Sequence, residues 1–232
     1  MSNPLIIVIG AYGSGKSEYS INLAKNMYSN GDTNVSLVDL DVVNPFFRSR
    51  FMRDRFEQIG IEVIAPEFQY GHADLPMISP RIRGVIQDTH KTVILDVGGD
   101  PAGCRALGRF VEDISHRGYS MHFVINTKRP FTTNADEILE MKNNLEFSSK
   151  LKITELISNT NLMELTDLEL ITTGINIINE VAVSQNLLFN TFLTMETGET
   201  NYPDEINGKT KMNLEHNLTK PWERNTQGNS FC

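Results

Sequence analysis

Short apolar runs alternate along the chain with longer segments in which apolar residues recur every three or four positions. Several of the short runs are rich in Val and Ile without alternating polar residues, which is typical of parallel strands covered on both faces. Seven runs of this kind predict strands: 5–9, 35–40, 61–65, 92–95, 122–125, 153–157 and 187–192.

The segments between these runs predict helices. Residues 17–30 place Ile21, Ala24 and Tyr28 at helical spacing and stop at Gly31, a common residue just after a helix. A capping residue followed by proline, at 44–45 and again at 79–80, indicates two more helix starts. We expect further helices over 104–116, 135–144 and 167–185.

Strands and helices alternating in this way predict an α/β fold, a doubly wound, mostly parallel sheet of about seven strands with helices on both faces. Ligands bind such a sheet at the carboxyl ends of its strands. We expect this domain to span residues 1–196. Residues 197–232 are dense in Asn, Thr, Gly, Lys and Glu without apolar periodicity, which predicts an extended or partly disordered tail.

Composition narrows the class of protein. With 40% hydrophobic and 22% charged residues, the 232-residue chain resembles neither collagen nor a disordered protein, and Cys104 and Cys232 cannot form a disulfide framework. A net charge of −8 argues against binding of nucleic acid through its phosphates. The longest apolar run, 5–9, is too short to cross a bilayer. We therefore expect a cytoplasmic protein that binds neither nucleic acid nor membrane.

The first expected strand leads into a phosphate-binding motif. The pattern G-x-x-x-x-G-K-[ST] is met by Gly10, Ala11, Tyr12, Gly13, Ser14, Gly15, Lys16 and Ser17, directly between a strand and a helix. Backbone N–H groups of such a loop surround phosphate oxygens, the lysine adds positive charge, and the serine hydroxyl binds Mg²⁺. We expect these eight residues and Glu18 to contact a nucleotide, with Ser17 as a metal ligand.

A second half of the site is expected after the strand 92–95. Asp96 follows this buried run directly, where a carboxylate holds Mg²⁺ beside the phosphate loop. Gly98 and Gly99 come next, so that a backbone amide can approach the terminal phosphate and respond to its presence.

Two more carboxylates, Asp39 and Asp41, end the second expected strand. Their spacing allows both to point to one side of the chain as it leaves the sheet. We assign Asp41 to orienting the attacking water and Asp39 to the Mg²⁺ shell, although the two roles could be exchanged.

Taken together, the motifs at 10–17, 38–41, 95–103 and 124–126 resemble those of the CobQ/CobB/MinD/ParA superfamily of P-loop nucleotide-binding proteins, over roughly residues 5–195. The resemblance implies that Asp41 belongs to the first switch and prepares water for ATP hydrolysis, and that Asp96 is the metal-associated acid. It also implies that an asparagine after the penultimate strand, Asn159 or else Asn161, contacts adenine.

One position departs from the superfamily pattern. Members of the MinD/ParA subgroup carry a second lysine early in the loop, which reaches the partner subunit's site, whereas Ala11 stands here. Activation could instead come from the arginines at 48, 50, 53 and 55. We single out Arg48 as the one that could act on the terminal phosphate, the alternative being an amphipathic helix with arginines on its wet face.

Other residues bear on which nucleotide or metal the protein binds. The segment 126–129 begins like the guanine-reading Asn-Lys-x-Asp motif but lacks both the lysine in register and the acid, so ATP is preferred over GTP. Cys104 lies where some superfamily members place metal or cluster ligands, although a small buried helix residue is favoured because a cluster needs four thiolates. The five histidines have no metal-ligand spacing.

Two functions follow from these observations. The first is a Mg-ATP-dependent switch with slow intrinsic hydrolysis, a protein partner and a nucleotide-dependent homodimer as one of its forms. The alternative is an ATP-dependent kinase or an amide-forming or cyclising ligase whose small anionic substrate would contact the arginines and residues 68–74. A partitioning protein of the ParA or MinD type is disfavoured, because neither a basic face nor a membrane-binding tail is evident.

Overall fold

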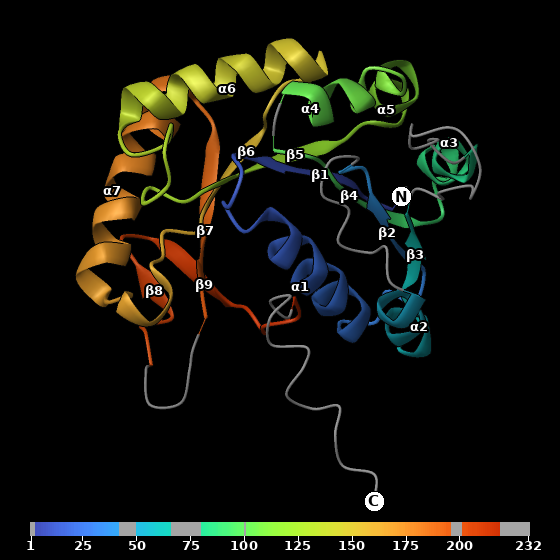
Figure 1. The fold of residues 1–232 in the computed structure, drawn as a ribbon, viewed down its shortest axis with the longest axis horizontal. Coiled ribbons are helices and arrows are strands. Elements are labelled where there is room, and N and C mark those ends of the chain that lie inside the picture. Colours follow the sequence, from blue (N-terminus) through green and yellow to red (C-terminus); the bar gives the residue numbers. More distant parts are fainter. Residues whose placement is uncertain (1–2, 42–49, 66–79, 100, 196–200, 219–232) are drawn as a thin grey trace, which may run out of the picture.

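The fold is built on a single mixed sheet. A computed structural model describes residues 3–41, 50–65, 80–99, 101–195 and 201–218, which form nine strands in the order β3-β2-β4-β1-β5-β6-β7-β9-β8 (Figure 1). All neighbouring strands are parallel except β8 and β9. The strands are β1 (Leu5–Gly10), β2 (Val35–Asp39), β3 (Glu62–Ile64), β4 (Thr92–Asp96), β5 (Ser120–Ile125), β6 (Glu155–Ser158), β7 (Leu188–Thr194), β8 (Glu205–Ile206) and β9 (Lys209–Asn213).

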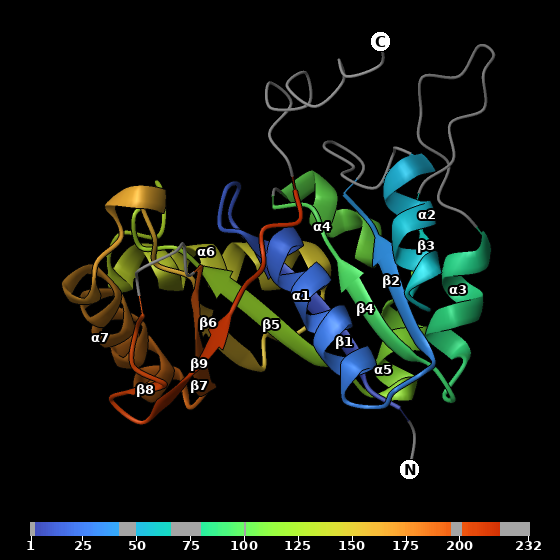
Figure 2. The ribbon, with the colours of Figure 1, turned by 90° about the horizontal axis from the view of Figure 1, so that it is seen from below.

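Helices cover both faces of the sheet, and the side chains of β1 show why. Leu5, Ile7 and Ile9 belong to one hydrophobic cluster, whereas Ile6 and Val8 belong to another on the opposite face. The first cluster is covered by α3 (Pro80–Gln87), α4 (Pro101–Leu107), α5 (Val111–Arg117), α6 (Ala135–Ser149) and α7 (Leu168–Gln185). The second is covered by α1 (Lys16–Ser29) and α2 (Arg50–Gln58), as Figures 1 and 2 show.

The predicted fold class is confirmed, and all seven predicted strands are present. The helix expected over 104–116 is wrong as a single element, because the chain turns at 108–110 between α4 and α5. Leu107, Phe110 and Ile114 are all buried at helix-like spacing, so the apolar pattern does not reveal the break. The helix start at 79–80 corresponds to α3, whereas residues 44–45 lie outside the described residues.

The described part of the segment after residue 196 contributes structure that the sequence pattern did not predict. β9 lies beside β7 in the sheet and is preceded by β8, a two-residue strand joined to it by Asn207 and Gly208. Both turn residues have positive φ, 50° and 74°, as a tight type I′ hairpin requires. Residues 214–218 then run back to α1, next to the start of the chain's first helix.

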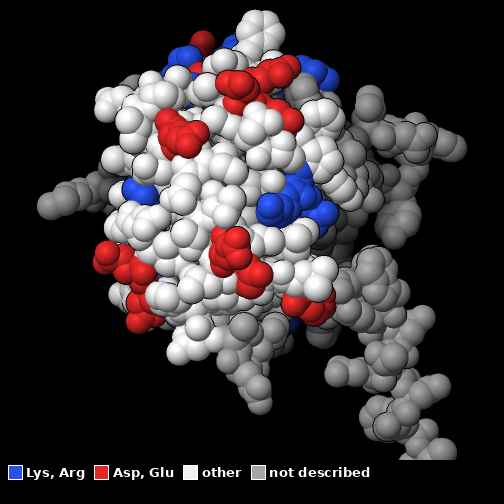
Figure 3. All heavy atoms as spheres, turned by 90° about the vertical axis from the view of Figure 1, so that its left-hand side faces the viewer, with Lys and Arg blue, Asp and Glu red and all other residues white. Residues whose placement is uncertain are grey.

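Charged side chains on one face of the molecule stand in small, separate groups (Figure 3). Figure 3 shows the side of the molecule on which α7 lies, where acidic and basic side chains are scattered among neutral ones. Among the described residues, no helix is long and apolar enough to cross a membrane.

Candidate functional site

The loop between β1 and α1 has the geometry expected of a phosphate-binding loop. Gly13 and Gly15 have φ of 75° and 87°, in the left-handed region where residues with a side chain are strained. Gly15 is the N-cap of α1, and no side chain caps the helix there. The first N–H groups of α1 are therefore left to a ligand at the positive end of the helix.

Close contacts fix this loop against its neighbours. A Cβ on Gly99 would lie 2.6 Å from the Gly10 carbonyl oxygen, so Gly99 packs directly on the loop, and its approach to a terminal phosphate stays a prediction. On the other side, Asn159 donates from Nδ2 to the Ser14 carbonyl oxygen at 2.7 Å, and Asn161 donates to Asn159. Asn159 thus positions the loop, and the contact of either asparagine with adenine stays a prediction.

The three candidate carboxylates gather at the carboxyl ends of β2 and β4. Asp39 and Asp96 are aligned neighbours in the parallel register and are both fully buried. The Asp41 backbone N–H donates to Asp39 Oδ1 at 2.9 Å, and Asp41 Oδ1 lies 3.2 Å from where a Cβ on Gly98 would stand. Asp41 therefore faces the segment that follows Asp96.

The pKa of the Asp96 carboxyl is raised by its surroundings. Burial raises the pKa of its carboxyl to about 6, with the positive charge of Lys16 opposing this rise and the negative charge of Asp41 adding to it. Ser20 donates to Asp96 Oδ1 at 3.4 Å. Lys16 is itself buried, so the cation of the phosphate loop and the carboxylate across the sheet act on each other in a medium that screens them poorly.

The same residues fit a bound magnesium ion. Ser17 Oγ and Asp96 Oδ2 are buried without a well-formed hydrogen bond within the described part of the chain, although Ser17 lies close enough to Asp96 to oppose the rise in the pKa of that carboxyl. Buried oxygens without partners are rare, and hydroxyl and carboxylate oxygens are ligands that Mg²⁺ prefers. Ser17, Asp96 and Asp41 are the residues that would hold the ion, directly or through water.

A cavity of about 580 Å³ opens beside the phosphate loop. Gly13, Gly15 and Glu18 line its polar end. Its remaining wall includes an apolar group, Ile171, Leu193, Met195, Tyr202, Leu214 and Leu218. Polar side chains, among them Glu164, Thr166 and Thr194, interrupt this apolar wall. A pocket that joins a phosphate loop to a wall of apolar and polar side chains matches the chemistry of a nucleotide, in which a charged tail is joined to a planar base that also carries polar groups.

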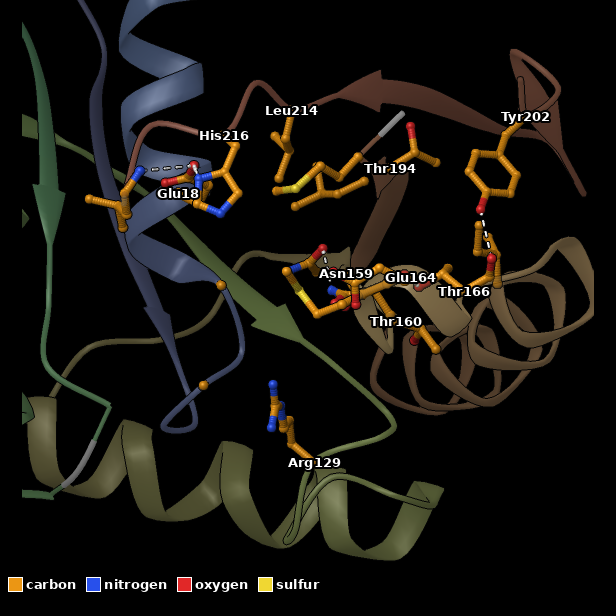
Figure 4. Close-up of a pocket in the computed structure, with 18 residues that line it drawn as sticks. Glu18, Arg129, Asn159, Thr160, Glu164, Thr166, Thr194, Tyr202, Leu214 and His216 are labelled. Atoms are coloured by element: carbon orange, nitrogen blue, oxygen red, sulfur yellow. Dashed lines mark hydrogen bonds and ion pairs between the residues drawn. The ribbon is translucent and has the colours of Figure 1, made fainter. Parts of the chain in front are cut away.

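Sequence reasoning missed several residues of this pocket. Arg129, from the loop after β5, lies over the phosphate loop, with Nε 3.5 Å from the position of a Cβ on Gly13. Tyr202, Leu214, His216 and Leu218 come from the segment expected to be a tail. In Figure 4, Leu214 and His216 lie on one side of Asn159 and Arg129 on the other. No local motif marks these residues, because the fold brings them to the site from distant parts of the chain.

Other candidate residues lie outside the described residues or away from the pocket. Arg48 and the loop 68–74 lie outside the described residues, so their roles stay predictions. Arg55, on α2, lies near Glu215, where its charge helps to lower the pKa of that carboxyl. Cys104 is fully buried in the core, with Sγ 3.6 Å from the Gly98 carbonyl oxygen, as expected of a small buried helix residue.

No model of a known protein family and no curated protein matches the sequence. Solved structures, in contrast, resemble the structure of this chain. One is the nucleotide-binding protein from Archaeoglobus fulgidus in complex with ADP, at 14% identity and a TM-score of 0.51, covering 84% of this chain and 83% of that chain. Another is chloroplast FtsY from Physcomitrella patens, at 17% identity and a TM-score of 0.55, covering 83% of this chain and 59% of that chain.

At these identities the likeness shows the fold, which is that of P-loop NTPases. The narrower resemblance to the CobQ/CobB/MinD/ParA superfamily stays a prediction.

Proposed function

We propose that this protein binds Mg-ATP and hydrolyses it slowly, as a nucleotide-dependent switch. The observation that carries the proposal is the continuity between the phosphate loop, at Gly13 and Gly15, and the cavity of about 580 Å³, whose remaining wall combines apolar side chains with polar ones. The complex of the Archaeoglobus fulgidus nucleotide-binding protein with ADP gives independent support.

Residues of the site can bind both the phosphates and the base of ATP. The loop amides and Lys16 would hold the phosphates, while the bound ion, on Ser17 and Asp96, would offset their negative charge. Asp41 would orient the attacking water, since it faces Gly98, and the next residue, Gly99, packs against the loop. The absence of an acid after Asn126 in the Asn-Lys-x-Asp pattern favours adenine.

The proposed switch depends on the contact between Gly99 and the phosphate loop. Because its backbone touches the phosphate loop, a terminal phosphate would order the segment after Asp96, and hydrolysis would release it. A partner protein or a second copy of the chain would recognise the ordered state. Without an activating group in place, turnover near 10⁻⁴ to 10⁻² per second is expected, on the order of other unstimulated P-loop enzymes.

The alternative, a metabolic enzyme acting on a small anionic substrate, depends on Arg48 and residues 68–74. These lie outside the described residues. The alternative is therefore tested by its enzymatic activity and by the size of the protein in solution. Release of ADP that needs a carboxylate substrate, from a protein that stays monomeric with Mg-ATP, would favour it.

The direct test compares Lys16→Ala with wild type. Fluorescent ATP and GTP analogues should bind wild type in the presence of Mg²⁺, with ATP preferred, and Lys16→Ala should lose about 100-fold or more in affinity, because a buried cation is removed from the phosphates. Lys152→Ala changes a lysine whose side chain is 81% exposed and serves as the matched control.

Phosphate release and molecular size, measured with and without Mg-ATP, complete this experiment. Nucleotide-dependent dimerisation with slow phosphate release would support the switch. If Lys16→Ala kept full affinity and turnover, the proposed phosphate site would be wrong.

A further inference from the structure

The chain's last described segment forms a wall of the pocket. We call residues 214–218 the strap. Leu214 and Leu218 line the apolar part of the cavity, and His216 lines it beside Glu18. The strap begins directly after β9, where the Leu214 backbone N–H donates to the Thr194 carbonyl oxygen at 2.7 Å. It therefore continues the edge of the sheet across the pocket towards α1.

Asn22 holds the middle of the strap on α1. Its Oδ1 accepts from the Glu215 backbone N–H at 2.8 Å, and its Nδ2 donates to the Glu215 carbonyl oxygen at 3.0 Å. One amide side chain thus satisfies both backbone groups of a strap residue. Asn22 is itself buried and does not line the cavity, and its Nδ2 also donates to the backbone carbonyl oxygen of Glu18, which does, at 2.8 Å.

Glu18 holds the end of the strap and directly follows the phosphate-loop serine. Its Oε1 accepts from the backbone N–H groups of Asn217 and of Leu218, the latter at 3.3 Å. Its Oε2 is buried without a hydrogen-bond partner among the described residues. Burial raises the pKa of the Glu18 carboxyl, while the two backbone bonds oppose this rise.

We infer that Asn22 and Glu18 are positioning residues for nucleoside binding, because they hold the strap as the closing wall of the nucleoside pocket. This inference rests on the proposed nucleotide site and goes beyond it. It assigns binding of the phosphates to the phosphate loop and not to the strap. The strap is assigned the affinity for the nucleoside and the slow release of the nucleotide. Leu214 and Leu218 supply the apolar contact, and the two α1 side chains keep them in place.

Asn22→Ala tests the strap without changing a side chain that lines the cavity. Release of a fluorescent ADP analogue should be about tenfold faster than in wild type, because two hydrogen bonds to the strap are lost. Asn26→Ala is the matched control, since Asn26 is an exposed asparagine one turn along the same helix whose side chain contacts Asn30.

Inorganic tripolyphosphate distinguishes positioning from a structural role. It carries the phosphates without a nucleoside, so Asn22→Ala should bind it within about twofold of wild type if the strap acts on the nucleoside alone. Equal losses for tripolyphosphate and nucleotide would overturn the inference, as would release rates equal to those of Asn26→Ala. If wild type binds tripolyphosphate but no nucleotide, the proposed function fails along with the strap's role.

Hydrogen exchange in wild type gives a measurement that does not depend on a variant folding. Backbone amides of Asn217 and Leu218 should exchange more slowly with ADP bound, and tripolyphosphate should leave their exchange unchanged. Exchange that ADP does not slow would contradict the strap's closure over the nucleoside.

Discussion

At the scale of single residues, the phosphate loop depends on glycines for two separate reasons. Gly13 and Gly15 adopt positive φ, whereas Gly10 and Gly99 leave room for the backbone of their neighbours. Gly15 has positive φ and also leaves room for a neighbouring side chain, because a Cβ there would lie 2.1 Å from Asn159 Nδ2. The conformation of the loop and its packing against the asparagine after β6 therefore depend on the same glycine.

Gly15→Ala should therefore be costly. Left-handed backbone costs about 1 to 2 kcal/mol for a residue with a side chain, and the collision with Asn159 adds to that cost. We expect a lower free energy of unfolding in a denaturant titration and a loss of nucleotide affinity of about tenfold or more, because the loop amides move.

Gly31→Ala separates strain from collision. Gly31 has a φ of 98°, and nothing lies within 4 Å of its missing Cβ, so only the strain should appear. In a double-mutant cycle, Asn159→Ala should relieve part of the cost of Gly15→Ala. Equal stability losses for Gly15→Ala and Gly31→Ala, with no coupling to Asn159, would show that the contact is unimportant.

Local motifs predicted the residues that lie close to the phosphate loop in sequence or at a strand end. Lys16, Ser17 and Asp96 come together because parallel strands β1, β4 and β2 end at one edge of the sheet. Arg129 and the strap could not be found in this way, because their role depends on how loops from distant elements fold over the cavity. Glu18 was expected at the nucleotide, and its contacts to the strap are a feature that only the structure reveals.

At the scale of elements, packing between α7 and the loop after β6 is tight at one glycine. A Cβ on Gly174 would lie 2.1 Å from Thr160 Oγ1, a group within 3.1 Å of Thr127 Oγ1. Thr160 also lines the nucleoside pocket. The absence of a side chain at 174 thus lets a long helix approach the pocket wall.

Two glycine-to-alanine changes inside helices should have opposite effects. Gly84, in α3, is exposed with nothing within 4 Å, so Gly84→Ala should raise the free energy of unfolding by about 0.5 to 1 kcal/mol through helix propensity. Gly174→Ala should lower it, because the collision with Thr160 outweighs that gain. Denaturant titration measures both, and stabilisation by Gly174→Ala would contradict the tight packing.

Elements that are apolar on both faces were the easiest to predict. Strands β1 to β6 are mostly buried runs with little competing pattern, and β7 is buried in its second half. The turn between α4 and α5, in contrast, was hidden by continuous apolar spacing. The strands after residue 196 were missed because β9 is polar, with the sequence Lys-Thr-Lys-Met-Asn, and the edge strand β8 has only two residues. A local signal was present, since Asn207-Gly208 is a strong type I′ turn sequence.

At the scale of the whole molecule, a buried polar cluster links α1 to the centre of the sheet. The Tyr19 hydroxyl lies 2.9 Å from His122 Nδ1, and Ser120 Oγ lies 2.9 Å from His122 Nε2. Glu155 is 3.5 Å from the same ring. Burial lowers the pKa of His122 to about 4, so the ring is neutral at pH 7 and its contact with Glu155 is no ion pair.

His122 should therefore make stability depend on pH. In the unfolded chain it takes up a proton below about pH 6.5, whereas in the folded protein it resists protonation down to about pH 4. Its contribution is present above pH 6.5 and is lost as the pH falls towards 4, by up to about 3 kcal/mol. Burial raises the pKa of Glu155, which acts in the opposite direction.

The measurement is the free energy of unfolding from pH 7.5 to 4, compared between wild type and His122→Gln. The variant should lose less stability on acidification than wild type, since the imidazole is gone. His90→Gln, at an exposed histidine, controls for the loss of an imidazole elsewhere. Parallel pH profiles for wild type and His122→Gln would show that this ring does not govern the acid response.

The strap also sets an order of events during synthesis. The phosphate loop is complete once residue 17 has been made, but the bond from Leu218 to Glu18 spans 200 positions of the chain. A nascent chain still attached to the ribosome, or a fragment ending before residue 214, would have its phosphate loop without the wall that closes the pocket. Tight nucleotide retention would thus be acquired only as the C-terminal part emerges.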